Sequence, residues 1–480
     1  MDRARSFSWW PKAIACLLLL TGCASATPLI LPRVGPTTNC IAPGPDSDLL
    51  IGIALSGGGS RAAVFGAAGL EALGRIRAAG GRSLLEEVGY VSSVSGGSVA
   101  GAYYAKNKPP KETPVLTPQG DYTNEYREFF TRYSERLSQN IEGALIRQQL
   151  SSFRWLNSAL AARSLQEVLQ EKLLGATTLG DLSARQVRGD IPAFMFNASL
   201  FNDGRRMIMS TLPEDIARYD VFADLRQAAA SRNDALEFVP LTQRMWEGLM
   251  AVTPLELRAD PCPIPVAGAV AASASFPPLV GPITFRVEGE ATYWHAGDGG
   301  LYENAGVETL ASVFLKKLQE GKAKRALIIS LDSSFPFAVA ERLLGRRSTP
   351  FSILTYDFSR IPGIMEQRAY AYNHLFIRSL RLEGVVPDAN TFRIMYLGHT
   401  DAAWQGDLSD LPEACRGEES VLRTPLQITE RLAEIPTRLK IFSECDRQLL
   451  VTSAAKVVAQ ARAEIESFLS GDPLPEHTAR

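Results

Sequence analysis

The residue with the clearest capacity for chemistry is Ser95, in the segment 93–98 that reads SVSGGS. Ester hydrolysis through a serine needs an exposed hydroxyl, a base within hydrogen-bond reach and donors for the oxyanion. A turn from a strand into a helix, built from small residues, projects such a hydroxyl outward, and the helix N-terminus favours the developing negative charge. Taken alone, the segment is better explained as a plain turn, because Ser and Gly are common and position 93 is serine where a GxSxG elbow has glycine.

A second candidate is the glycine run Gly57, Gly58 and Gly59, which offers unobstructed backbone N–H groups at the entry to a helix. Such a geometry suits an anion. A nucleotide site is disfavoured, because no Lys-Ser or Lys-Thr follows as in a P-loop and Ala62 takes the sixth position of a GxGxxG frame. The run therefore fits an oxyanion hole better than a phosphate site.

The candidate base is Asp298, whose neighbours 297, 299 and 300 are glycines that let the backbone bend toward another loop. An Asp-Gly-Gly segment can also be a simple turn. An aspartate with a pKa near ~3.9 is a poor proton acceptor at neutral pH, so Asp298 must be partly desolvated or act on an acidified hydroxyl. The rival base is His295, three residues earlier, although a lone histidine is more often structural.

Metal chemistry is not indicated by the sequence. The four histidines, at 295, 374, 399 and 477, have no ligand spacing, and no CxxC pair occurs. Neither a metal nor a cofactor is expected. The formal net charge of -2 also gives no reason to propose a nucleic-acid partner, which would call for a basic excess.

Strand–turn–helix units are expected to position these residues. A buried-strand pattern precedes the glycine run and another precedes Ser95, and each is followed by a helix of small residues. Alternating strands and helices predict a mostly parallel sheet. A hairpin turn is expected at Asn202-Asp203-Gly204, and 106–182 reads as a helical cap or insertion. The strand candidates are 49–55, 88–94, 193–200, 206–210, 326–331 and 392–397, and a helix is expected over 449–469.

The first 22 residues are typical of a secretion signal. Basic residues precede the apolar run 13–20, which is too short to span a bilayer. The sequence LTGC at 20–23 resembles the lipobox of bacterial lipoproteins, which predicts lipidation of Cys23. A plain signal peptide or a short membrane anchor is the alternative. The absence of Asp after Cys23 resembles lipoproteins of the outer membrane, here facing the periplasm.

Residues 23–47, rich in Pro, Thr, Ala and Gly, are expected to form a lipidated tether with a reach of roughly 25 to 30 Å. Four further cysteines remain, Cys40, Cys262, Cys415 and Cys445, in a compartment where disulfides persist. They allow three connectivities. The pair Cys415 and Cys445 is weakly favoured, because both lie in the C-terminal subregion.

In combination and order, the motifs resemble the patatin-like phospholipases. The resemblance spans residues 48–310, with 311–480 expected to continue the same domain. The segments that carry it are SGGGSR at 56–61, SVSGGS at 93–98, FNA at 196–198, AASASFPP at 271–278 and DGG at 298–300.

This resemblance implies a three-layer α/β/α fold and a Ser–Asp dyad. Ser95 would be the nucleophile, Asp298 the general base and the N–H groups of Gly57–Gly59 the oxyanion hole. Arg61 would order the glycine loop or meet a lipid phosphate. Ser93 and Ala62 depart from the family pattern, and Ser93 adds bulk under the turn.

The sequence therefore predicts a lipid acyl hydrolase, either a phospholipase A or a carboxylic ester hydrolase, that acts on membrane lipids or lipid-like esters through an acyl-enzyme. Two alternatives stay open. An acyltransferase would use the same dyad with an acceptor other than water. A non-catalytic lipoprotein scaffold would keep only the fold.

Overall fold

The computed structural model describes residues 28–472, apart from residues 153, 155–157, 219–249, 278–279, 335–359, 383, 385–386, 417–421 and 442. The predicted signal peptide 1–22 and the lipidation site Cys23 lie outside the described residues. Over the described ranges, no helix is both long enough and apolar enough to cross a bilayer.

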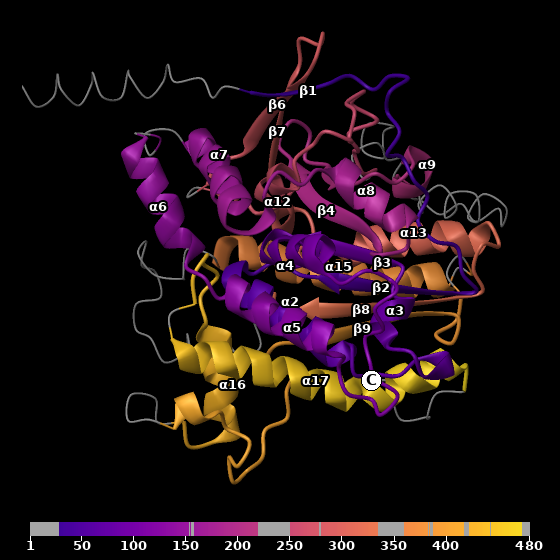
Figure 1. The fold of residues 1–480 in the computed structure, drawn as a ribbon, viewed down its shortest axis with the longest axis vertical. Coiled ribbons are helices and arrows are strands. Elements are labelled where there is room, and N and C mark those ends of the chain that lie inside the picture. The colour runs from indigo at the N-terminus through magenta and orange to yellow at the C-terminus, as the bar shows by residue number, and fades with distance from the viewer. Residues whose placement is uncertain are drawn as a thin grey trace, which may run out of the picture.

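A nine-stranded, mostly parallel sheet forms the centre of the molecule (Figure 1). Its spatial order is β1-β6-β7-β4-β3-β2-β8-β9, with β5 paired to β4. The pairs β4–β5, β4–β7 and β6–β7 are antiparallel, and the other pairs are parallel. The strands are β1 (Leu29–Leu31), β2 (Leu49–Leu55), β3 (Tyr90–Val94), β4 (Ala193–Leu200), β5 (Arg206–Met209), β6 (Ile283–Val287), β7 (Tyr293–Asp298), β8 (Arg325–Asp332) and β9 (Phe392–Gly398).

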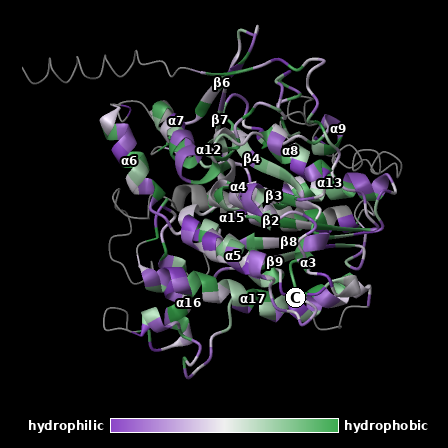
Figure 2. Cartoon of the chain, in the orientation of Figure 1, coloured by the Kyte–Doolittle hydropathy of each residue, from purple (hydrophilic) through white to green (hydrophobic). Residues whose placement is uncertain are grey.

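Both faces of the sheet are covered by helices, which makes three layers and confirms the predicted α/β/α fold. Alternate side chains of a strand point to opposite faces. Accordingly Ile51, Ile53 and Leu55 of β2 pack in one hydrophobic cluster, while Leu50 and Ala54 pack in the other. Because both faces are buried, the central strands are largely hydrophobic, whereas outer helices such as α5 carry hydrophilic stretches (Figure 2).

The larger cluster includes helices α2, α4, α5, α7, α12 and α17, and the smaller includes α9, α13 and part of α15. Within 106–182 the named elements are all helices, joined by turns and loops, and α5 packs on α2 and α4 while α7 packs on α12. The longer helices are α2 (Gly59–Leu73), α4 (Ser95–Asn107), α5 (Asn124–Leu137), α6 (Ile141–Ser151), α7 (Ser158–Leu169), α8 (Leu179–Val187), α12 (Val266–Ser273), α13 (Val307–Gln319), α15 (Arg360–Leu382), α16 (Pro425–Glu434) and α17 (Glu444–Ser470); α3 (Leu84–Glu87) and α9 (Glu214–Ala217) are short.

The predicted strands and the C-terminal helix are present. Seven of their fourteen ends match, six differ by one or two residues, and α17 starts five residues earlier than predicted. The hairpin between β4 and β5 is also confirmed, and Gly204 has the positive φ of 77° that such a turn requires. The chain after residue 310 adds β8 and β9 to the same sheet, and α17 packs along α2.

The tether predicted for residues 23–47 is wrong for its described part. Leu29–Leu31 form β1, which pairs in parallel with β6 at the edge of the sheet. Cys40 is joined to Cys262 by a disulfide. A strand pairing and a covalent bond fix this segment to the body, so residues 28–47 do not act as a flexible linker. The second disulfide, Cys415–Cys445, confirms the pairing that the sequence favoured.

Candidate active site

Ser95 lies where β3 ends and α4 begins, in a backbone conformation that is unusual for a residue with a side chain. Its φ is 49°, in the left-handed region where a Cβ is disfavoured. Such strain persists only where the surroundings over-determine it. Here the backbone N–H of Ser95 donates to Ser273 Oγ at 2.9 Å. The turn thereby holds the hydroxyl at the carboxyl end of the central strands.

The Ser95 hydroxyl donates to Asp298 Oδ2 at 2.8 Å, although the two residues are 203 positions apart. The sheet brings them together. Asp298 ends β7, which pairs with β4, and β4 pairs with β3, whose last residue precedes Ser95. The other carboxylate oxygen accepts from the N–H of Gly300 at 2.8 Å, which fixes the orientation of the carboxylate.

The electrostatics of Asp298 suit a general base. Its side chain is only 3% exposed. Burial raises the pKa of Asp298 to about 6, against the hydrogen bonds from Gly300 and Ser95, which lower it. The carboxylate is therefore mostly ionised at neutral pH but is a far better proton acceptor than an ordinary aspartate. Asp298 is thus desolvated, as the sequence predicts for a carboxylate that acts as the base.

The glycine loop lies directly against the serine turn. A Cβ on Gly96 would lie 1.9 Å from the carbonyl oxygen of Gly59, so only glycine allows the two turns to approach so closely. Gly57 does not have a free N–H group, because it donates to the carbonyl of Asn304 at 2.9 Å. Its inclusion in the oxyanion hole is therefore corrected. Within the described part of the chain, the N–H groups of Gly58 and Gly59 have no acceptor and remain as candidate donors.

Arg61 is a buried structural residue in this geometry. Its guanidinium donates through Nη1 to Ile435 O at 2.8 Å and through Nη2 to Ser333 O at 2.7 Å. The residue is 2% exposed, which leaves no access for a phosphate group. Of the two roles that the sequence left open, the geometry fits ordering of the glycine loop and not contact with a lipid phosphate.

A group of buried hydroxyls behind Ser95 was missed by the sequence reasoning as a functional feature. Ser273 Oγ, which accepts from the Ser95 N–H, itself donates to the carbonyl of Asn197 at 2.5 Å. Ser98 Oγ lies 2.9 Å from Ser273 Oγ and donates to Ser93 Oγ at 3.1 Å. The Ser93 side chain, which adds bulk under the turn, is thus part of this hydrogen-bonded network. The only sequence signal was the resemblance of the segment containing Ser273.

The two histidines with described side chains lie away from the dyad contact. His295 Nδ1 is 3.0 Å from Thr284 Oγ1 on the neighbouring strand β6. His399 is buried beside Phe65, and burial and the nearby Arg61 hold the pKa of its imidazole well below the usual range. Among the described side chains, the hydrogen-bond partner of Ser95 Oγ is Asp298 and not a histidine.

One group in the described ranges has metal-ligand atoms close together, namely Cys40, Asp260 and Cys262. Its two sulfurs are joined as a disulfide, so neither is a thiolate that could bind a metal.

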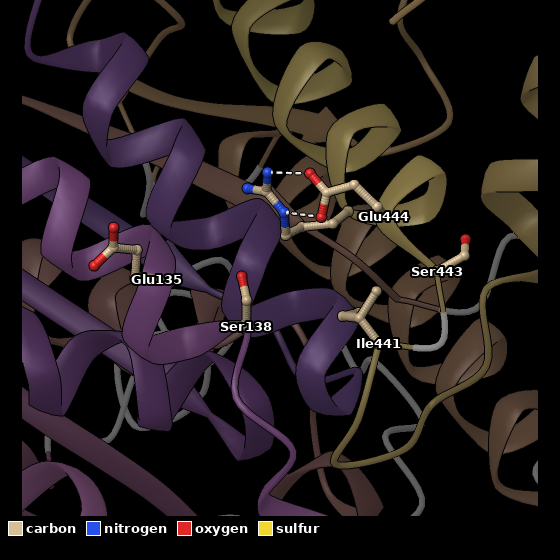
Figure 3. A pocket seen from close by; sticks show the side chains of 6 residues that line it. Glu135, Ser138, Ile441, Ser443 and Glu444 are labelled. Carbon is tan, nitrogen blue, oxygen red and sulfur yellow. Dashed lines mark hydrogen bonds and ion pairs between the residues drawn. The ribbon is translucent and has the colours of Figure 1, made fainter. Parts of the chain in front are cut away.

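A separate surface pocket of about 450 Å³ lies between the end of α5 and the start of α17 (Figure 3). It is lined by Glu135, Ser138, Ile441, Ser443, Glu444 and Arg447, and Arg447 is ion-paired with Glu444. No residue of the dyad or the glycine loop lines it, so it is not part of the candidate active site.

The fold and the site together define a three-layer α/β protein with a buried Ser–Asp pair at the carboxyl edge of its sheet. The family model of the patatin-like phospholipases matches residues 53–311, which is more than half of the chain. The chain therefore belongs to the patatin-like phospholipase family. This membership supports lipid hydrolase activity.

Solved structures with a similar arrangement include human GIVD cytosolic phospholipase A2, at 13% sequence identity, with a TM-score of 0.42 and coverage of 88% of this chain. The same human enzyme in complex with methyl gamma-linolenyl fluorophosphonate and terbium chloride matches with a TM-score of 0.44 at 13% identity, over 88% of this chain and 59% of that chain. The chain spans 60% of the length of the first of these. VipD from Legionella pneumophila matches at 10% identity with a TM-score of 0.27, over 95% of this chain and 83% of that chain. No curated protein matches.

Proposed function

We propose that this chain is a phospholipase A or related carboxylic ester hydrolase that acts at a membrane surface through the Ser95–Asp298 dyad and an acyl-enzyme intermediate. The observation that carries the proposal is the 2.8 Å hydrogen bond from Ser95 Oγ to the buried Oδ2 of Asp298. A strained serine at the tip of a strand-to-helix turn, bonded to a carboxylate with a raised pKa, is arranged as an activated nucleophile.

In the acylation step, Oγ of Ser95 attacks the ester carbonyl carbon while its proton passes to Oδ2 of Asp298. The resulting oxyanion is stabilised by the N–H groups of Gly58 and Gly59 and by the N-terminus of α4. Asp298 then gives the proton to the leaving alkoxide as the carbon–oxygen bond breaks. A water molecule repeats the sequence on the acyl-enzyme, which releases the fatty acid and restores Ser95.

We also propose that Cys23 anchors the chain to the outer membrane, facing the periplasm. The support comes from the leader and lipobox in the sequence. Two disulfides within the described body are further support, because such bonds persist in oxidising compartments. Release of a Cys23→Ala variant from membranes washed with salt is expected, and its retention after the salt wash would contradict the anchoring.

The central experiment compares the parent with Ser95→Ala on vesicle phospholipids and with a fluorophosphonate probe. We expect Ser95→Ala to lose both hydrolysis and labelling while keeping its melting temperature within a few degrees, because only one hydroxyl and its hydrogen bond to Asp298 are removed. Lipid analysis of the products would identify the acyl position. His295→Ala is the matched control and should keep at least about a tenth of the activity, a loss below ~1.4 kcal/mol. Turnover by Ser95→Ala at the parent rate would overturn the assignment.

A further inference from the structure

Helix α15 carries an unusual combination of exposed apolar and basic side chains. Ile364, Leu375 and Leu382 are 60%, 65% and 77% exposed, far more than hydrophobic residues of a helix that covers a core. They are spaced 11 and 18 residues along the helix, which corresponds to about three and five turns, so they lie on one face. Tyr372, 57% exposed, lies at the side of the same face.

Two arginines lie on this same face. Arg368 and Arg378 follow Ile364 by 4 and 14 residues, or about one and four turns, and both are exposed. Helix α15 contains four arginines and one glutamate, whereas the whole chain has a formal net charge of -2. The helix thus has a local excess of positive charge, whereas the chain as a whole is close to neutral.

The opposite face of α15 is the one that packs against the body. Tyr370 meets Tyr396 of β9 edge-on, with ring centroids 5.1 Å apart. Ile377, seven residues further along the helix, packs against the smaller hydrophobic cluster. The helix is therefore already oriented by its own core contacts, and the face with the exposed residues is turned outward.

Helix α15 lies close to the loop that carries Asp298. The helix packs against the short helix η4 (Gly299–Leu301), which continues directly from Asp298. In Figure 1, α15 lies behind the strands, while α4, which begins with Ser95, lies in front. The contact with η4 places α15 next to the loop that carries the base, on the other side of the strands from α4.

We propose that the outward face of α15, defined by Ile364, Arg368, Leu375, Arg378 and Leu382, docks the protein on an anionic phospholipid bilayer. An interfacial helix buries apolar side chains at the headgroup boundary while its basic side chains meet anionic lipid phosphates. The proposal rests on the proposed function, because it supplies the surface from which that dyad takes its substrate.

The binding test uses the full chain with Ser95→Ala, so that the vesicles are not degraded, and with Cys23→Ala, so that no anchor contributes. Sedimentation with vesicles of phosphatidylcholine and phosphatidylglycerol measures the partition coefficient. We expect Leu375→Glu/Leu382→Glu to lower the coefficient at least tenfold. Arg368→Gln/Arg378→Gln should lower it on anionic vesicles only and should weaken its salt dependence. The matched controls, Val187→Glu on α8 and Arg132→Gln on α5, are exposed elsewhere and should bind as the parent does.

The activity test keeps Ser95 and compares two substrates. Hydrolysis of vesicle phospholipid should fall at least tenfold in Leu375→Glu/Leu382→Glu, while hydrolysis of a short water-soluble ester should change less than twofold. Equal binding by these variants and the parent would overturn the proposal. An equal loss of activity on both substrates would also overturn it. So would a parent protein that is a dimer and becomes monomeric on substitution, because the face would then bind a second copy of the chain. If the proposed function itself is wrong, the Ser95→Ala variant will still hydrolyse phospholipid, regardless of how strongly it binds vesicles.

Discussion

The two turns that follow β2 and β3 have the same layout but are held in different ways. The first places Gly58 and Gly59 at positive φ values of 139° and 61°, which glycine adopts without strain. The second places Ser95 at 49°, where the side chain makes the conformation costly. The first turn must present N–H groups and the second a hydroxyl. The second therefore cannot use glycine at its tip and depends on hydrogen bonds from outside.

These outside contacts come from different parts of the chain. The glycine turn is held by distant carbonyls, through Gly57 to Asn304 O and through Ser60 to Arg438 O at 2.6 Å. The serine turn is held by the hydroxyl of Ser273 and by Asp298. The effects of substitutions in one turn can therefore be separated from those in the other, except where the turns touch.

The largest expected effect is the loss of activity when Asp298, which contacts the serine turn, is replaced. Asp298→Asn should lower kcat/KM at least a thousandfold, because the amide cannot accept the Ser95 proton. In the parent, kcat/KM should rise with pH through about 6, as Asp298 loses its proton. A pH profile of hydrolysis, together with labelling by a fluorophosphonate, measures both.

The same substitution should stabilise the fold at neutral pH. The pKa of Asp298 is higher in the folded protein than its ordinary value of 3.8, so the folded state prefers the protonated form. The buried charge therefore costs stability above pH 6, of the order of 3 kcal/mol, and this cost disappears as the pH falls toward 4. Thermal unfolding of Asp298→Asn against the parent should show a higher Tm at pH 7.5 and a smaller difference at pH 4.5. A Tm of Asp298→Asn below that of the parent at pH 7.5 would contradict the prediction that the buried charge destabilises the fold.

The next effect concerns the point where the two turns touch. Gly96→Ala should reduce activity at least a hundredfold and also destabilise the protein, because its Cβ would lie 1.9 Å from Gly59 O. Gly101→Ala on the same helix α4 is the matched control, since its Cβ meets neighbours only at 3.5 Å. Kinetics and thermal unfolding of the two variants measure the difference. Equal behaviour would mean that the turns do not need this approach.

A third effect isolates the glycine turn. Gly58→Ala should lower kcat about a hundredfold, because the residue has a φ of 139° and its Cβ would lie 2.8 Å from Ser333 O. Loss of an oxyanion-hole donor typically lowers kcat by about a hundredfold or more. Gly66→Ala in α2 has an ordinary contact of 3.5 Å and should leave kcat unchanged. If Gly58→Ala raised KM alone, the donors would be serving substrate binding and not the transition state.

The smallest effect tests Ser273 as a positioning residue. Ser273→Ala removes the acceptor for the Ser95 N–H and should lower kcat about tenfold, roughly 1.4 kcal/mol, with little change in KM. The rate of fluorophosphonate labelling should fall in parallel, and Ser273→Thr should restore part of it. Unchanged labelling with a lower Tm would show that the hydroxyl serves stability only.

Much of the fold followed from local patterns in the sequence. Central strands such as β2 and β8 are continuous hydrophobic runs, because both faces of a parallel sheet are buried. The three strands at one end of the sheet, β1, β6 and β7, were not predicted, whereas β9 at the opposite edge was. β1 and β6 are short, with three and five residues, so each offers little of the period-2 pattern that identifies a strand. The segment 28–47 looked like a linker because its order comes from distant partners.

The local sequence specifies the chemistry at each turn. Glycine at 57–59 and at 96–97 and a serine at 95 are local requirements, since only these residue types allow the close approach and supply the hydroxyl. The three-dimensional fold specifies which groups come into contact. The strand order brings Asp298 to Ser95, engages the N–H of Gly57 and buries Arg61, because each partner lies hundreds of residues away and pairing at that distance depends on the whole sheet.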